Sequence, residues 1–234
     1  GGRLRLVSEP PGAEVLAAGG DCVDAVIATT FALGVLEPWM SGAGGGGAMV
    51  LYRAREDRYE VIDYGMRAPL SLRPEDYPLT GDGAASDIFP WPRVKGDRNI
   101  QGPGSIAVPG VVAGMEEAHR RHAKLPWKEL LAPSVRLAGE GLAVDWWTTL
   151  MISSSAVDLR RYPASAAAYL VDGLPPNAPW GIKSHVRLPQ DRLGDIQRGF
   201  HGITVKQYLR LGKPCPGGLR GGGWLWRRVA APSI

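Results

Sequence analysis

Four consecutive glycines, Gly44–Gly47, are the chemical feature around which this sequence is organised. They join an apolar, helix-like run over residues 25–36 to an apolar, strand-like run over residues 48–52. Because each glycine in an ordered element costs roughly 0.5–1 kcal/mol relative to alanine, four in a row predict a place that excludes side chains. The backbone there must approach another group closely or adopt a positive φ angle. A flexible loop is the alternative, and the apolar flanks argue against it.

The same glycines match a dinucleotide-binding pattern only formally. Gly42, Gly44 and Gly47 satisfy G-x-G-x-x-G, but that fingerprint has to follow a strand and open a helix. Here the helix-like run comes first and the strand-like run comes second. We therefore do not assign nucleotide binding to this segment.

A histidine pair is the second candidate for chemistry. His119 and His122 are spaced i, i+3 on a helix expected over residues 111–122, a spacing that can serve a metal ion. No acidic or cysteine partner at ligand spacing supports such a site. A solvated helix face, shared with Glu116 and Glu117, is the favoured interpretation, and no metal or cofactor is expected.

Composition and charge indicate a soluble globular protein without a nucleic-acid footprint. The chain has 234 residues, 44% apolar and 21% charged, and no apolar run long enough for a membrane span. The last 44 residues hold eight Lys/Arg and two Asp/Glu, whereas the first 190 hold 19 and 21. The positive charge therefore lies in the tail, and the body lacks the basic patch that nucleic-acid binding needs. The first residues have no apolar stretch typical of a signal peptide, which leaves cytoplasmic and periplasmic locations open.

The first half of the chain predicts two helices followed by a hairpin. A short helix over 13–18 ends at Gly19-Gly20, and Asp21 has the chemistry to cap a second helix over 23–36. That helix is apolar nearly all round, which predicts burial. Its one charged residue, Asp24, either lies in the exposed first turn or is a buried, paired group, and the sequence favours the first.

Other elements follow from turn and breaker residues. Strands over 47–52 and 58–64 are separated by a polar turn and predict an antiparallel hairpin. Residues 71–97 are rich in proline and predict loops. Pro133 is expected to separate two helices, over 128–131 and 133–140.

Four further expectations concern a helix cap, a tryptophan pair, a strand and a cysteine. Asp145 is expected to cap a helix over 146–159, and the Trp146-Trp147 pair within it to be core rather than a ligand site. A strand bounded by turns is expected over 169–173. Two cysteines make no disulfide framework, and Cys22 is expected to be a small core residue because it lies at the start of a helix predicted to be buried.

Several motifs together resemble one enzyme family. The sequences GGDCVDA (19–25), EP (37–38) and SGAGGGG (41–47) are similar in order and spacing to GGNAVDA, EP and SGIGGGG of the γ-glutamyltransferase family. That family belongs to the N-terminal-nucleophile hydrolases and includes acylases that act on cephalosporins. Residues 102–110, GPGSIAVPG, resemble the family's GPxSVAVPG, and residues 125–141 also match. The resemblance covers residues 8–189 and implies part of an αββα sandwich, within the α/β or α+β class.

The resemblance also implies a substrate-binding arginine near the end of the second strand. The family pattern is close to DFRExAP, where the arginine binds the substrate's α-carboxylate; this chain has DYGMRAP, residues 63–69. Counted back from Ala-Pro, Gly65 occupies the arginine's position. Arg67 lies two residues later, on the same face of a regular strand and about 6–7 Å further along it. Arg67 either serves a longer acyl chain or is a surface residue.

The nucleophile that the resemblance implies is missing from this sequence. In the family, self-cleavage creates an N-terminal Thr, usually followed by Thr-His, whose own amine acts as base. Thr29-Thr30 and Thr148-Thr149 lie in expected helices and precede Phe31 and Leu150 rather than histidine. Ser153–Ser155 has no G-x-S-x-G context. The chain is therefore interpreted as the N-terminal part of the large subunit, with no catalytic residue of its own.

Two functions remain open at this stage. The first is amide-bond hydrolysis or acyl transfer on γ-glutamyl compounds such as glutathione, or on glutaryl-type amides, together with a small-subunit segment that carries the nucleophilic Thr. The Trp39-Met40 pair and the displaced arginine favour the acylase-like branch. The second is a truncated, inactive chain that only binds a partner. Residues 190–234 are basic and Gly/Pro-rich, and are interpreted either as a loosely packed tail outside the family sequence or as a divergent, structured terminus.

Overall fold

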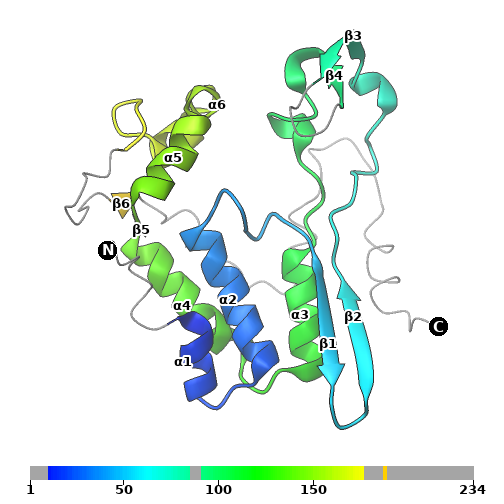
Figure 1. Cartoon of the computed structure of the whole chain (residues 1–234), viewed down its shortest axis with the longest axis vertical. Helices are drawn as coiled ribbons and strands as arrows, with labels where there is room; N and C mark the ends of the chain where they lie inside the picture. The colour runs from blue at the N-terminus through cyan, green and yellow to red at the C-terminus, as the bar shows by residue number, and fades with distance from the viewer. Residues whose placement is uncertain (1–9, 85–90, 177–186, 189–234) are drawn as a thin grey trace.

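The computed structural model describes residues 10–84, 91–176 and 187–188. Its described part is a mixed α/β unit in which a group of helices lies beside a two-stranded hairpin, with smaller elements above both (Figure 1). The main core joins buried residues from the helices and from the inward face of the hairpin, among them Ile27, Phe31, Met49, Ile62, Met115 and Leu130. Within this part, no helix is both long and apolar enough to cross a lipid bilayer.

The first two helices form as their capping residues predict. Helix α1, Pro11–Ala17, is followed by Gly19 in the left-handed region at φ 93°. Helix α2, Cys22–Leu36, begins at Asp21, whose carboxylate accepts hydrogen bonds from the backbone N–H groups of Val23 and Asp24. The Asp24 carboxylate in turn accepts from the Asp21 N–H at 2.9 Å, which completes a reciprocal capping box.

Asp24 corrects the sequence expectation, because it lies in the first turn and is nevertheless fully buried. Its carboxylate also accepts hydrogen bonds from the backbone N–H groups of Lys124, at 3.2 Å, and Leu125, at 3.4 Å. These two donors lie 100 and 101 residues further along the chain, in the connection that follows the helix of residues 111–122. Three backbone N–H groups and the positive end of the α2 dipole therefore compensate the buried charge.

Helix α2 is less completely buried than its apolar sequence predicts. Val26 and Leu33 are 46% and 37% exposed. Cys22, expected in the core, is an exposed free thiol at the first helical position.

The predicted hairpin is present. Strand β1, Ala48–Arg53, pairs antiparallel with β2, Arg58–Asp63, with Met49 opposite Ile62 and Val50 opposite Val61. The ladder continues to Gly47 and Tyr64, which exchange backbone hydrogen bonds of 3.3 and 2.9 Å.

Helices α3 and α4 complete the main core. Helix α3, Val111–His122, has the predicted bounds, whereas α4, Trp127–Glu140, is one continuous helix rather than two. Pro133 lies inside α4 and is buried there. Proline removes one intrahelical hydrogen bond, and burial of the α4 face carrying Leu130, Leu131 and Leu137 keeps the helix intact.

The upper part of the molecule contains short elements (Figure 1). A hairpin of β3, Leu79–Ala84, and β4, Pro92–Val94, stands within the segment predicted to be loops. Two residues of β5, Leu142–Ala143, pair with β6, Arg187–Leu188. Short 3-10 turns at 74–76, 95–97 and 103–105 connect these elements.

The helices of this upper part differ from the predictions in two ways. Asp145 caps α5, Trp146–Ser154, as expected, but Ser155 breaks the helix before α6, Ala156–Arg160. Trp146 and Trp147 are 68% and 41% exposed rather than core.

The strand expected over 169–173 is replaced by two other elements. Helix α7, Pro163–Tyr169, ends where the strand was expected to begin. It is followed by a tight turn that closes with a bridge between Val171 and Leu174. Asp172 and Gly173 have positive φ angles, as the central residues of a type I′ turn do. The predicted basic tail, residues 190–234, lies outside the described residues.

Candidate functional site

The glycine run approaches other groups closely, as its composition predicts, at every position except Gly44. A Cβ on Gly46 would lie 2.6 Å from the Met66 nitrogen and 2.9 Å from the Tyr64 carbonyl oxygen. A Cβ on Gly47 would lie 3.1 Å from the Tyr64 ring, whereas one on Gly44 would meet nothing within 4 Å. None of the four glycines has a positive φ angle. Close approach, not unusual dihedral angles, therefore explains Gly46 and Gly47.

The same run also holds the start of α3. The carbonyl oxygen of Gly45 accepts hydrogen bonds from the N–H groups of Gly110 and Val111, at 2.9 and 3.1 Å. These are N–H groups that a helix start leaves without intrahelical partners. The glycine segment thus meets two other motif segments, residues 63–69 and 102–110.

Arg67 lies where residues 63–69 meet residues 102–110. Its backbone pairs with Val108 in an antiparallel bridge with N–H···O distances of 3.2 and 2.8 Å. Its side chain is exposed, and no carboxylate within the described ranges forms an ion pair with it. Strand β2 ends at Asp63, whose carboxylate accepts a hydrogen bond from the Gly65 N–H, so the regular strand assumed for the spacing of Gly65 and Arg67 does not extend to Arg67. The Arg67 side chain is therefore exposed and not ion-paired among the described residues, and the backbone of its neighbour Met66 closely approaches Gly46.

Tyr64 is the residue of this region that the sequence did not identify. A Cβ on Gly110 would overlap its carbonyl oxygen, and a Cβ on Gly114 would overlap its ring and approach its Cβ to 2.6 Å. Burial raises the pKa of the Tyr64 phenol above its usual value. Gly110 and Gly114, spaced i, i+4, form one face at the start of α3, and that spacing is the signal that predicts a slot for an aromatic ring.

Two side chains anchor the loop that leads to Val108. The Tyr77 hydroxyl donates a 2.6 Å hydrogen bond to the Gly104 carbonyl, and the Arg161 guanidinium donates one of the same length to the Gln101 side chain. Gly102 has φ 78°, and a Cβ there would lie 2.9 Å from the Tyr162 hydroxyl. The loop is therefore held from two sides before it reaches Arg67.

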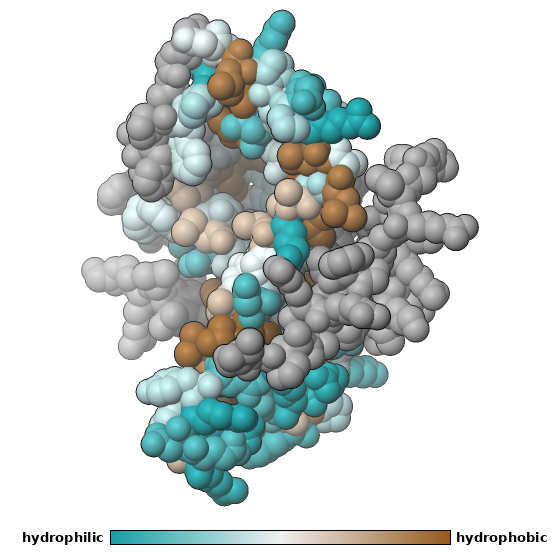
Figure 2. Space-filling view, turned by 90° about the vertical axis from the view of Figure 1, so that its right-hand side faces the viewer, coloured by the Kyte–Doolittle hydropathy of each residue, from teal (hydrophilic) through white to brown (hydrophobic). Residues whose placement is uncertain are grey.

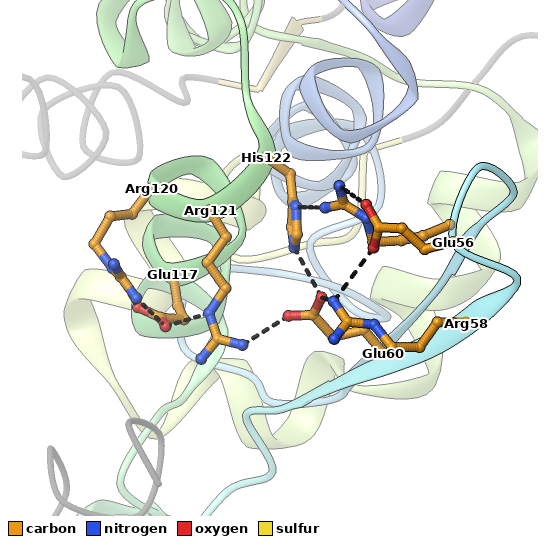
Figure 3. A network of polar contacts seen from close by, with 8 residues as sticks. Glu56, Arg58, Glu60, Glu117, Arg120, Arg121 and His122 are labelled. Atoms are coloured by element: carbon orange, nitrogen blue, oxygen red, sulfur yellow. Dashed lines mark hydrogen bonds and ion pairs between the residues drawn. The ribbon is translucent and has the colours of Figure 1, made fainter. Parts of the chain in front are cut away.

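A network of charged side chains joins the far end of α3 to the hairpin (Figure 3). Glu117 is 6% exposed and accepts hydrogen bonds from Arg120 and Arg121, and Arg121 also donates to Glu60 at 2.7 Å. His122 accepts a 2.8 Å hydrogen bond at Nδ1 from Arg53, because a guanidinium can only donate.

This network corrects the expectation of a solvated helix face. The Nε2 atom of His122 lies 3.4 Å from the Glu60 carboxylate, and the ring is only 11% exposed. His119 contacts the Leu125 carbonyl at 2.9 Å and packs against Trp127. The described residues contain no group of three His, Cys, Asp or Glu side chains arranged for a metal ion.

The network predicts acid sensitivity with a definite sign. Hydrogen bonds from Arg120 hold the pKa of Glu117 below its ordinary value, and those from Arg121 do the same for Glu60. A carboxyl group whose pKa is lowered in the folded state stabilises the fold at pH values above its ordinary pKa of about 4.3. This stabilisation is lost as the pH falls through the folded-state pKa. In urea unfolding measured from pH 6 downward, the free energy of unfolding of Glu117→Gln should therefore fall less on acidification than that of the unsubstituted chain. Glu75→Gln, at an exposed residue outside the network, is the control. If the free energy of unfolding of Glu117→Gln depended on pH as steeply as that of the unsubstituted chain, Glu117 would not be the source of the acid sensitivity.

The two Thr-Thr pairs of the sequence lie within helices α2 and α5. Thr30 lies inside α2 and donates its hydroxyl to the Val26 carbonyl. Thr149 lies inside α5, with its hydroxyl within hydrogen-bond distance of the carbonyls of Asp145, at 3.0 Å, and Pro176, at 2.9 Å. Both hydroxyls are thus bonded to backbone carbonyls within or next to helices.

Comparison with solved structures first defines the class of fold. The chain superimposes on the crystal structure of gamma-glutamyltranspeptidase from Helicobacter pylori with a TM-score of 0.70 at 23% identity, covering 87% of this chain and 55% of that one. At that identity the likeness establishes the fold alone: a mixed α/β partial domain that corresponds to part of the larger structure.

The sequence comparisons then establish the family. The family model described as gamma-glutamyltranspeptidase matches residues 10–184. The chain is 36% identical over 180 residues to the acylase ACY 1 proenzyme of Pseudomonas sp. (strain SE83), and 36% identical over 164 residues to the glutathione hydrolase proenzyme of Bacillus subtilis (strain 168). This chain belongs to the gamma-glutamyltranspeptidase family of N-terminal-nucleophile hydrolases. It spans 31% of the length of the first relative and 26% of the second.

Proposed function

We propose that this chain is the N-terminal part of the large subunit of an amide-bond hydrolase or acyltransferase, in which Arg67 binds the carboxylate of the acyl group. The observation that carries the proposal is the meeting of three motif segments at one place: Gly45 with Gly110, Gly47 with Tyr64, and Arg67 with Val108. The hairpin and the helices beside it then form part of an αββα sandwich.

The setting of Arg67 supports a dicarboxylic acyl group. A guanidinium binds a carboxylate through two parallel hydrogen bonds, and that of Arg67 is exposed and unpaired among the described side chains. Gly65 stands where the family pattern has its arginine, so the charge is displaced along the chain. This displacement suits a carboxylate farther from the scissile amide, as in a glutaryl amide, and we place the complete protein nearer to the acylases than to the glutathione hydrolases.

Arg67→Ala in the complete protein should raise KM for glutaryl-p-nitroanilide and leave kcat nearly unchanged. The expected loss is about 1.5–3 kcal/mol, the range for a hydrogen bond to a charged group, or about ten- to hundredfold in kcat/KM. Arg67→Lys should retain part of the binding, because the charge stays and the bidentate geometry is lost. Arg73→Ala, at an exposed arginine outside the motif, is the matched control. Unchanged kcat/KM for both glutaryl and γ-glutamyl substrates would make Arg67 a surface residue.

The nucleophile is proposed to come from a partner segment that begins with Thr, as in the proenzymes of the family. The purified 234-residue chain should therefore show no turnover of γ-glutamyl-p-nitroanilide or glutaryl-p-nitroanilide. Joining it to the remaining part of the complete protein should create the activity. Turnover by the chain alone, at a rate that scales with its purity, would refute this division of roles.

A further inference from the structure

Arg67 lies in a stretch of chain that has no buried residue of its own. Residues 65–76 follow strand β2, are exposed or half-buried throughout, and include the short 3-10 turn Pro74–Asp76. Figure 2 views the side of the molecule that carries the hairpin and shows hydrophobic residues at the surface of its upper part, interspersed with hydrophilic ones. Because this stretch buries no side chain in a core, the position of Arg67 depends on contacts with other segments.

Two contacts join this stretch to residues 104–108. At one end, Arg67 pairs with Val108 through backbone hydrogen bonds of 3.2 and 2.8 Å. At the other end, the Tyr77 hydroxyl donates a 2.6 Å hydrogen bond to the carbonyl oxygen of Gly104. The Tyr77 contact shortens the loop that the bridge has to close, and therefore lowers the entropy that closing it costs.

The Tyr77 side chain is itself held in place. The guanidinium of Arg98 lies over the tyrosine ring, 6.0 Å from its centroid, at the outer limit of a cation–π contact. The backbone N–H of Tyr77 donates a 3.0 Å hydrogen bond to the Pro74 carbonyl, and the carbonyl of the next residue, Pro78, accepts one of 2.8 Å from the Lys95 N–H. The phenol hydroxyl is therefore presented to its acceptor from a fixed position.

The acceptor segment, residues 104–108, is held at both of its own ends. Before it, the Gln101 side chain accepts a 2.6 Å hydrogen bond from Arg161 of the upper helices. The Ser105 hydroxyl donates a 2.8 Å hydrogen bond to the Gly102 carbonyl. After it, the chain runs into α3, whose first N–H groups are bound by the glycine run. Tyr77 thus ties an exposed stretch to a segment that is anchored independently.

We propose that Tyr77 is a positioning residue for Arg67: its hydrogen bond to Gly104 keeps the Arg67 backbone on its bridge to Val108, and so keeps the guanidinium where the acyl carboxylate binds. The inference rests on the proposed function, in which Arg67 binds that carboxylate. Breaking the hydrogen bond lowers the fraction of molecules with Arg67 in place, and the apparent affinity for substrate falls with that fraction. Saturating substrate selects the molecules with Arg67 in place, so KM rises while kcat stays the same.

Tyr77→Phe in the complete protein should raise KM for glutaryl-p-nitroanilide about two- to tenfold, the effect of losing one hydrogen bond of ordinary strength, and should leave kcat unchanged. In the Arg67→Ala background, Tyr77→Phe should have no further effect, because the residue that it positions is gone. Tyr52→Phe is the matched control. It removes a tyrosine hydroxyl that donates to Asp57 at 2.9 Å in the hairpin turn, and it should change neither constant.

The possible outcomes separate this inference from the proposed function. An unchanged KM in Tyr77→Phe, or an equal rise in KM with and without Arg67, would overturn the positioning role, while the effect of Arg67→Ala kept the proposed function. A loss of kcat without a change in KM would overturn it as well. No effect of Arg67→Ala itself would reject the proposed function, and the positioning role with it.

Amide hydrogen exchange in the 234-residue chain gives a measurement that needs no substrate. The N–H groups of Arg67 and Val108 form the bridge, and both should exchange several-fold faster in Tyr77→Phe. The Gly110 N–H, which donates to Gly45 at 2.9 Å, should exchange at an unchanged rate. Unchanged exchange at Arg67 and Val108 would show that Tyr77 does not hold the bridge. Faster exchange at all three amides would indicate general loosening, and either result would overturn the inference.

Discussion

Gly114→Ala should unfold this chain or destabilise it by at least about 3 kcal/mol, the upper end of overpacking penalties. The added methyl group would overlap the ring of Tyr64 and lie 2.6 Å from its Cβ. Neither group can yield easily, because Tyr64 is fixed by backbone hydrogen bonds to Gly47 and Gly114 is held inside α3. Urea unfolding followed by circular dichroism measures the loss.

The matched control is another helical glycine with free space around it. A Cβ on Gly139 of α4 would meet nothing within 4 Å, so Gly139→Ala should stabilise the chain by about 0.5–1 kcal/mol through helix propensity. Adding Tyr64→Leu to Gly114→Ala should recover part of the loss, since the smaller side chain vacates the slot. Similar effects of the two alanine substitutions would show that Tyr64 does not occupy this slot.

Asp24→Ala is the second substitution from which we expect a large loss, about 3 kcal/mol or more. It removes the acceptor for three backbone N–H groups, those of Asp21, Lys124 and Leu125, and each buried donor left unpaired costs about 1–3 kcal/mol. Asp24→Asn keeps the shape and one acceptor oxygen and should lose less. Chemical unfolding gives the free energies, and hydrogen exchange at the Lys124 and Leu125 amides should accelerate.

The control for Asp24→Ala is a substitution at an exposed carboxylate. Asp158 forms a 3.6 Å surface ion pair with Arg161, with 45% of its side chain exposed. Such pairs contribute about 0–1 kcal/mol, so Asp158→Ala should change little. Equal losses at Asp24 and Asp158 would mean that the buried tether does not stabilise the fold.

Local chemistry made part of this fold predictable. Asp21 caps α2, α3 spans the expected residues 111–122, and the hairpin forms about the expected turn, because caps, helical periods and turns act within a few residues. The close approach of the glycine run was predictable for the same reason, since glycine composition alone signals excluded side chains.

Contacts between distant residues account for what the sequence did not reveal. The burial of Asp24 depends on two amides that lie 100 and 101 residues away. Pro133 continues α4 because the buried face around it offsets the lost hydrogen bond, and no local rule measures that burial. At the site, the glycine composition did not identify its partner, Tyr64, because the slot at Gly110 and Gly114 is formed only after α3 docks beside β2.

The Asp24 tether closes the chain into a ring. All three motif segments, residues 41–47, 63–69 and 102–110, lie between Asp24 and Lys124 and therefore inside that ring. Closing a long flexible loop costs entropy that grows only as the logarithm of its length, about 0.6 kcal/mol for each doubling. One carboxylate thus restricts the conformational freedom of all three motif segments at once, and insertions in the loops within the ring should be tolerated better than any change at the carboxylate that closes it.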